Sequence, residues 1–126
     1  MDLQPRRFAD TLVLAPVGRI DHASAESLKE ALAPYLGRCA AGQDQLVLDL
    51  SGVDYISSAG LRVLMLARKQ AKVQSGTLVV AALSPIVREI FEISRFTVVF
   101  EVFPSAREAL ARISPTGLAA FDEASA

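Results

Sequence analysis

A helical segment between two short apolar runs constrains the fold of this chain more than any other feature. The runs LVLDL at 46–50 and TLVVAAL at 77–83 have the length and composition of buried strands. Between them, SAGLRVLMLARKQAKV at 58–73 contains good helix formers and no proline, and it ends in a basic turn shortly before Gly76. Because a strand–helix–strand unit crosses over in the right-handed sense to a parallel strand, this pattern predicts an α/β fold.

The N-terminal third predicts an edge strand, a second strand and a first helix. LVLAPV at 12–17 is typical of a strand, and residues 3–8 are expected to pair with it in the antiparallel sense. Pro5 keeps that first strand at the edge of the sheet, because proline cannot donate a backbone hydrogen bond. Asp21 is expected to cap the helix that follows. The apolar stripe of this helix consists of Ala25, Leu28, Leu32 and Leu36.

The C-terminal part predicts two further helices and a last strand. Ser84 and Pro85 are expected to be the N-cap and the first residue of one helix. The run TVVFEVF at 97–103 is expected to be the last strand, and Ser105 is expected to open the final helix. Strands therefore alternate with helices to the end of the domain.

The length and composition are those of one globular domain. The chain has 126 residues, of which 52% are hydrophobic and 21% are charged, so it is expected to bury a single core. We predict one domain at 1–113, of class α/β, with a mixed, mostly parallel sheet of about five strands and about four helices. Residues 114–126 are expected to form a flexible C-terminal tail.

Charge and residue counts exclude several classes of function. Thirteen Lys and Arg against 14 Asp and Glu leave a net charge of −1, too little positive charge for nucleic-acid binding. A single cysteine, Cys39, excludes an intrachain disulfide, and a single histidine, His22, leaves no ordinary zinc ligand set. Neither a metal site nor a cofactor is expected. The N-terminus has no signal-peptide pattern, and apolar runs such as 63–67 are far too short to span a bilayer. We expect a cytoplasmic protein without direct membrane insertion.

Ser58 is the residue that most invites a catalytic interpretation. It stands between a strand and a helix, as the serine of a nucleophile elbow does. That elbow needs a glycine two residues before the serine, where this chain has Ile56, and only His22 is present to act as the base. We therefore expect that the chain is not an enzyme. From the residues alone, Ser58 is more simply interpreted as a helix cap.

Three segments carry a resemblance to a known family. They are LDLSGVDYISSAGLRVLMLARKQAK, GTLVVAALSPIVREIFEISRF and the upstream GRIDHASAESL. Together they resemble the anti-sigma-factor antagonists of the STAS domain family, and the likeness extends from about Leu12 to Ile113. The resemblance implies a STAS-like domain that binds an anti-sigma factor with serine kinase activity and thereby releases a sigma factor.

The resemblance also implies a switch. In the family, the kinase inactivates the antagonist by phosphorylating a serine at the start of the second helix, and by position that serine is Ser58. Well-studied members have an acidic residue directly before it, where this chain has Ser57, so Ser57 stays an alternative phosphorylation site. Other roles of STAS domains also stay open: a scaffold of a stress-signalling assembly, or an accessory subunit of a membrane transporter. Homodimer formation is left open as well.

The expected partner-binding surface surrounds the switch serine. Asp21 matches a family position near the phosphorylation site, and steps of three and four from Ser58 place Arg62, Met65 and Lys69 on one helical stripe. Met65 is expected to face the solvent as a partner contact, because other side chains supply apolar surface for the sheet: Leu61, Val63, Leu64, Leu66 and Ala67. The expected partner-binding residues are Asp21, Ser57, Ser58, Ala59, Gly60, Arg62, Met65 and Lys69.

Overall fold

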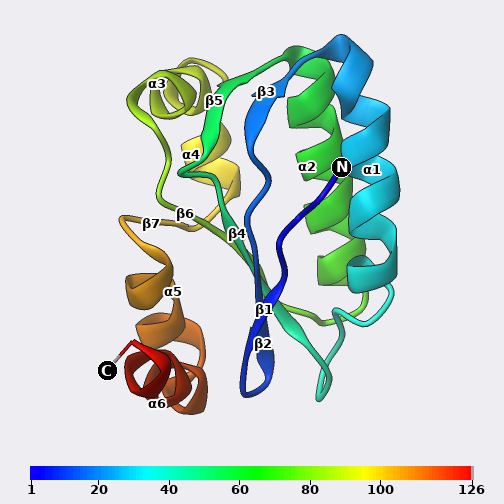
Figure 1. The fold of residues 1–126 in the computed structure, drawn as a ribbon. Helices are drawn as coiled ribbons and strands as arrows, with labels where there is room; N and C mark the ends of the chain where they lie inside the picture. Colours follow the sequence, from blue (N-terminus) through cyan, green and yellow to red (C-terminus); the bar gives the residue numbers. More distant parts are fainter. Residues whose placement is uncertain (126) are drawn as a thin grey trace.

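The computed structural model describes residues 1–125 (Figure 1). Strands and helices alternate through most of this part of the chain. The strands are β1 (Arg6–Phe8), β2 (Thr11–Leu14), β3 (Gly18–Ile20), β4 (Gln45–Asp49), β5 (Val53–Ile56), β6 (Leu78–Ala81) and β7 (Val102–Phe103). The helices are α1 (His22–Leu36), α2 (Ser58–Val73), α3 (Pro85–Ile93), α4 (Phe96–Val99), α5 (Ala106–Ile113) and α6 (Pro115–Ala124).

Five strands form the main sheet, in the order β1-β2-β4-β6-β7. β1 and β2 are antiparallel, and the other neighbours are parallel, which confirms the mixed, mostly parallel α/β sheet predicted from the sequence. A separate parallel pair, β3 and β5, leads directly into α1 and α2. Because these two strands pair side by side, the first turns of α1 and α2 lie at the same end of the molecule (Figure 1).

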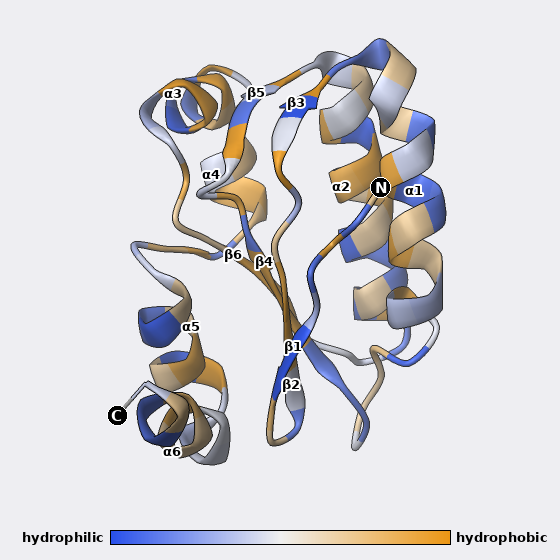
Figure 2. Ribbon diagram, in the orientation of Figure 1, coloured by the Kyte–Doolittle hydropathy of each residue, from blue (hydrophilic) through white to orange (hydrophobic). Residues whose placement is uncertain are grey.

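The sheet separates two apolar layers. α1 and α2 pack on one side of it, and α5 and α6 pack on the other (Figure 1). Alternate residues of β4 serve the two layers: Leu46 and Leu48 face α1 and α2, and Val47 faces α5. The central strands are therefore apolar along their length, while the helices expose their hydrophilic faces (Figure 2).

The predicted strand at 97–103 is wrong for most of its length. Phe96–Val99 forms the short helix α4, and only Val102–Phe103 joins the sheet. The cause is tertiary packing: Phe96 and Phe100, one turn apart, cluster with Phe91 of α3 at ring distances of 5.5 and 6.3 Å. Burial of these rings outweighs the β propensity of the run between them.

The predicted strand at 12–17 divides into two. β2 ends at Leu14, and after Pro16 the chain leaves the main sheet to begin β3 at Gly18. Gly18 donates its N–H to the carbonyl of Gly52 over 2.8 Å, which starts the pairing with β5. Sequence analysis did not identify β3 or β5, because each is only three or four residues long.

Residues 115–124, expected to belong to a flexible tail, form helix α6. Ser114 accepts a hydrogen bond from the N–H of Gly117 and so caps this helix. The ring of Phe121 lies 5.1 Å from that of Phe8 in β1, and Arg107 of α5 forms a two-point ion pair with Asp122. These contacts hold α6 against the sheet edge and α5.

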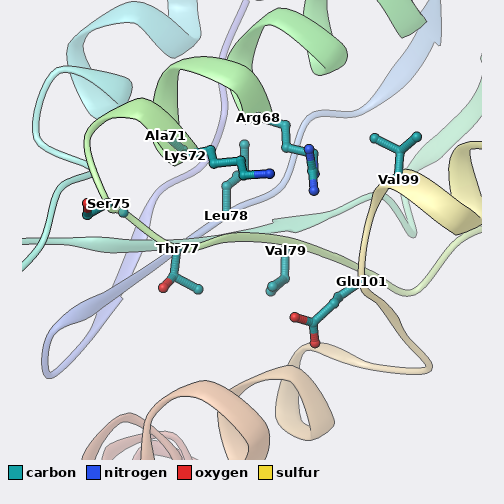
Figure 3. Close-up of a pocket in the computed structure, with 10 residues that line it drawn as sticks. Arg68, Ala71, Lys72, Ser75, Thr77, Leu78, Val79, Val99 and Glu101 are labelled. Carbon is teal, nitrogen blue, oxygen red and sulfur yellow. The ribbon is translucent and has the colours of Figure 1, made fainter.

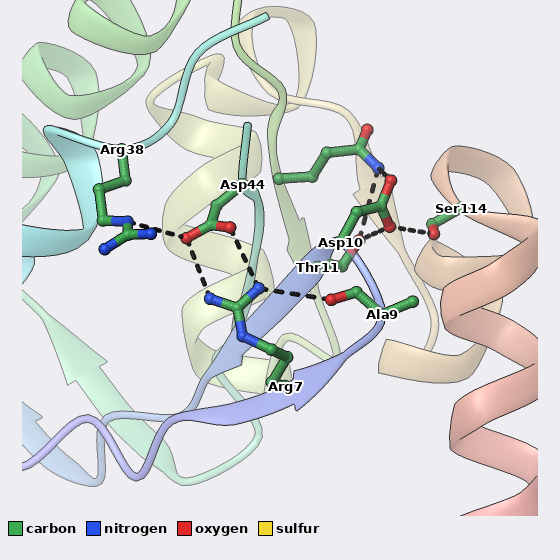
Figure 4. Close-up of polar contacts among 8 residues, drawn as sticks. Arg7, Ala9, Asp10, Thr11, Arg38, Asp44 and Ser114 are labelled. Carbon is green, nitrogen blue, oxygen red and sulfur yellow. Dashed lines mark hydrogen bonds and ion pairs between the residues drawn. The ribbon is translucent and has the colours of Figure 1, made fainter. Parts of the chain in front are cut away.

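An ion-pair cluster fastens β1 to the loop that follows α1 (Figure 4). Arg7 donates two hydrogen bonds of 3.1 Å to the carboxylate of Asp44, and Arg38 lies 3.6 Å from the same carboxylate. The hydrogen bonds from Arg7 hold the pKa of the buried Asp44 below its usual value. This cluster stabilises the end of the domain opposite the first turn of α2.

Candidate functional site

The first turn of α2 is fixed by Ser57. Its side-chain oxygen accepts a hydrogen bond of 3.2 Å from the N–H of Gly60, which makes Ser57 the N-cap. Its own N–H donates to the carbonyl of Ile20 in β3 over 2.8 Å. Ser57 is half-buried and is bonded on both sides, so its main role in the fold is to join the start of α2 to β3.

Ser58 occupies a different environment one residue later. It is the first residue of α2, and its side chain is exposed. Within residues 1–125 its hydroxyl group takes part in no hydrogen bond, in contrast to the hydroxyl group of Ser57. The structure therefore assigns the helix cap to Ser57 and leaves the Ser58 hydroxyl group accessible from outside.

The two serines are expected to respond differently to alanine. Ser57→Ala should lower the free energy of unfolding by about 1 kcal/mol, because it removes the N-cap hydrogen bond. Ser58→Ala should change it by less than about 0.5 kcal/mol, because an exposed hydroxyl group without a partner is lost. Urea unfolding curves of the two variants test this, and equal losses would contradict the assignment of the cap.

Gly60 allows α2 to approach β3 and β5 closely. A Cβ atom at Gly60 would lie 2.7 Å from a methyl carbon of Ile20 and 2.8 Å from a side-chain carbon of Ile56. Both isoleucines are 1% exposed, so neither has free space into which to move. Ala59, the other small residue of this turn, is half-buried. The glycine at position 60 thus allows the first turn of α2, with Ser57 and Ser58, to pack directly against the β3–β5 pair.

Asp21 caps α1, as predicted. Its carboxylate accepts the N–H of Ser24 over 3.0 Å, while the Ser24 hydroxyl group accepts the N–H of Asp21, a complete capping box. The hydrogen bonds from Ser24 lower the pKa of Asp21, so it carries a negative charge at neutral pH. Arg19 lies 3.8 Å from Asp21 and 4.0 Å above the Tyr55 ring, and this group forms a polar border beside the start of α2.

A mainly apolar hollow of about 380 Å³ lies beside Ser58. Phe96 of α4 forms one wall, so residues distant in sequence meet here. The lining consists of Ser58, Leu61, Arg62, Met65, Leu66 and Phe96. Sequence analysis missed Phe96 as a site residue, because its place depends on the left-handed turn at Arg95 that precedes α4.

The exposure of α2 corrects two expectations. Met65, expected to face the solvent, is half-buried and packs against the core. Leu66, expected to face the sheet, is instead 45% exposed. The buried face of α2 consists of Gly60, Leu61, Leu64, Ala67 and Ala71, so the helix is rotated slightly about its axis from the expected orientation. Leu66 is therefore the most exposed apolar side chain around the hollow.

Lys69 lies outside this hollow. It is exposed two turns beyond Arg62 and lines neither the hollow beside Ser58 nor a second one toward the other end of α2. That second hollow lies at the start of β6, between Arg68 and Lys72 of α2 and Glu101 before β7 (Figure 3). The structure thus brings Ser58, Arg62 and Met65 together and places Lys69 apart from them.

The residues singled out for chemistry are separated in the structure. His22 is exposed at the start of α1, and no hydrogen bond joins it to Ser58 in the described residues. Cys39 is fully buried and donates a hydrogen bond to the carbonyl of Thr77, and burial raises the pKa of its thiol. Within residues 1–125, no helix is long and apolar enough to cross a membrane, and no group of three or more His, Cys, Asp or Glu side chains could hold a metal ion.

The site thus consists of an exposed serine at the start of a helix, beside an apolar hollow, in a mixed α/β domain. The sequence matches the STAS domain family over residues 3–109. The chain belongs to that family, as its motifs predicted.

Several of the similar proteins are described as anti-sigma factor antagonists. The chain is 42% identical over 118 residues to BtrV of Bordetella bronchiseptica, whose name describes an anti-sigma factor antagonist, and the match covers 94% of this chain and 98% of BtrV. A crystal structure from Thermotoga maritima, also described as an anti-sigma factor antagonist, has a TM-score of 0.80 at 18% identity, covering 88% of this chain and 93% of that one.

The same fold occurs in a protein solved in two states. The phosphorylated form of the Bacillus cell-fate determinant SpoIIAA has a TM-score of 0.64 at 16% identity, covering 87% of this chain and 97% of that chain. Its unphosphorylated form has a TM-score of 0.70 at 17% identity, covering 87% and 94%. At these identities the likeness concerns the fold.

Proposed function

We propose that this protein is an anti-sigma factor antagonist that binds an anti-sigma factor with serine kinase activity and is inactivated by phosphorylation at Ser58. The relation to BtrV supports the role, because it extends over nearly the whole of both chains. The observation that carries the proposal is the exposed, unbonded Ser58 hydroxyl group beside an apolar hollow. In a cytoplasmic pathway of this kind, the kinase supplies ATP and the catalytic groups, and this chain supplies the acceptor.

The transfer step needs only the Ser58 hydroxyl group from this chain. Its oxygen forms the new bond to the γ-phosphorus of kinase-bound ATP, the bond from that phosphorus to ADP breaks, and the hydroxyl proton passes to the kinase. Ser58 is exposed, so a kinase active site has access to it. The half-buried Ser57 is less suited, because phosphorylation there would break the cap of α2.

The same position explains how a phosphate would stop binding. The proposed docking surface includes the hollow beside Ser58 and continues to Asp21 at the start of α1. A phosphate adds about 1.5 to 2 negative charges at its border, and a partner that covers the hollow would have to remove water from that charge. The surface can therefore be switched without any change of fold. Its proposed residues are Asp21, Ser57, Ser58, Ala59, Gly60, Arg62, Met65 and Lys69, with Leu66 and Phe96 added from the structure.

Incubation with the cognate anti-sigma kinase and ATP tests the proposal. The unmodified protein should gain one phosphate, which mass spectrometry of its peptides should place on Ser58. Ser58→Ala should reduce incorporation at least about a hundredfold and should still bind the kinase, because the acceptor oxygen is lost and the docking surface is kept.

Ser57→Ala is the matched control, since it lies one residue away and keeps the acceptor. It should still be phosphorylated. Full incorporation into Ser58→Ala would move the phosphorylation site elsewhere. Tight binding of the unmodified protein without any phosphate transfer would favour the scaffold role over the antagonist role.

A further inference from the structure

Arg62 is an unpaired cation one helical turn after Ser58. Both residues are exposed and line the same hollow. Within residues 1–125 the Arg62 side chain forms no ion pair and no hydrogen bond. The ion pairs of this part of the chain are formed by other arginines: Arg7, Arg19, Arg38 and Arg107. The guanidinium group of Arg62 is thus available to an anion close to the first turn of α2.

The charged groups around Arg62 leave room for such an anion. On its other side Arg62 lines another hollow, which lies between α1 and α2. The charged or titratable groups there are His22, Glu26 and Lys29. The carboxylate of Glu26 lies beyond ion-pair distance of Arg62, and Phe96 and Met65 on the Ser58 side are uncharged. A negatively charged group on residue 58 could therefore pair with Arg62 without displacing a carboxylate already paired with it.

We propose that Arg62 binds the phosphate group of phosphorylated Ser58. This inference rests on the proposed function, since it concerns the state that phosphorylation creates. Residues four apart on a helix face each other, and an acidic group N-terminal to a basic one is the favourable order. A guanidinium group also matches phosphate geometry, because two of its N–H groups can donate to two phosphate oxygens at once.

This contact changes the surface in two ways at once. Unphosphorylated, the border of the hollow presents a free positive charge at Arg62 and a neutral hydroxyl group at Ser58. Phosphorylated, the border presents a net negative ion pair, and the guanidinium group is no longer free for a carboxylate of the partner. The phosphate thus removes one attractive group in addition to placing a repulsive one.

The test uses protein with phosphoserine installed at position 58 during synthesis, so that no kinase is needed. The pKa for the second ionisation of the phosphate is measured from the pH dependence of its ³¹P chemical shift. It should be lower with Arg62 present than in Arg62→Gln by about 0.3 pH units or more, because the guanidinium group favours the dianion. Arg62→Lys should restore part of this difference.

Lys69→Gln is the matched control. It removes one positive charge from the same helix, but about 16 Å further along the axis than Ser58. It should leave the titration unchanged. His22 is present in every variant and contributes equally to each curve.

Equal titration curves for the native chain and Arg62→Gln, or equal shifts in Arg62→Gln and Lys69→Gln, would overturn the assignment of Arg62. Either result would leave the proposed function intact, because kinase recognition of Ser58 is measured separately. Conversely, failure of the kinase to modify Ser58 would refute the proposed function without altering these titrations.

Discussion

Gly60→Val should lower the free energy of unfolding by about 3 kcal/mol. The first added carbon alone would lie 2.7 Å from Ile20 and 2.8 Å from Ile56, well inside van der Waals contact. Both isoleucines are buried, so relief requires α2 to move away from β3 and β5. Such a movement would also break the hydrogen bond from Ser57 to the carbonyl of Ile20, which adds to the loss. Urea unfolding measures the change directly.

Gly37→Ala is the control for this prediction. Gly37 follows α1 with ordinary helical backbone angles, and an added Cβ would lie 3.6 Å from its nearest neighbours, which is normal contact. The substitution should change stability by no more than about 0.5 kcal/mol. If Gly60→Val were equally mild, the start of α2 would not be pressed against the β3–β5 pair, and the fixed position of Ser58 would need another cause.

The parts of the fold that sequence analysis predicted correctly are those in which local signals agree. The segment 58–73 has strong helix formers, a serine pair before it and a basic last turn, and the helix occupies those residues in the structure. The run TVVFEVF at 97–103 is rich in β-branched and aromatic residues, yet its first part forms a helical turn, because Phe96 and Phe100 pack against Phe91. The secondary structure of such a segment is decided by tertiary contacts, which the local pattern does not contain.

In the candidate site, too, the residues with local or motif signals were predicted from the sequence, and those placed by tertiary contacts were not. Ser58 was identifiable because a family motif marks it, and Asp21 because its capping chemistry is local. Phe96 was not identifiable as a site residue, because it lies on α4, a helix that the sequence pattern did not indicate. Met65 is more buried and Leu66 more exposed than expected, because the exact rotation of the helix about its axis is decided by packing on the sheet.

The position of Leu66 leads to the largest expected effect on partner binding. It is 45% exposed and borders three adjoining hollows, one beside Ser58 and two along the groove between α1 and α2. In the free protein, a glutamate at this position would keep its charge in water, so Leu66→Glu should leave the thermal midpoint nearly unchanged. In the complex, the same carboxylate would be covered, and the affinity for the anti-sigma factor should fall at least about tenfold.

Two further substitutions show whether this effect belongs to the docking surface. Met65→Glu places the same charge one residue earlier, on a half-buried side chain that packs against the core, and should lower stability by about 1–3 kcal/mol. Val73→Glu places it on a residue that is 79% exposed at the far end of α2, and should change neither stability nor binding appreciably. Calorimetric titration and thermal unfolding of all three variants distinguish the cases. If Leu66→Glu bound as tightly as Val73→Glu, the partner would not cover the hollow beside Ser58, and the proposed phosphorylation of Ser58 would have to act on a surface elsewhere.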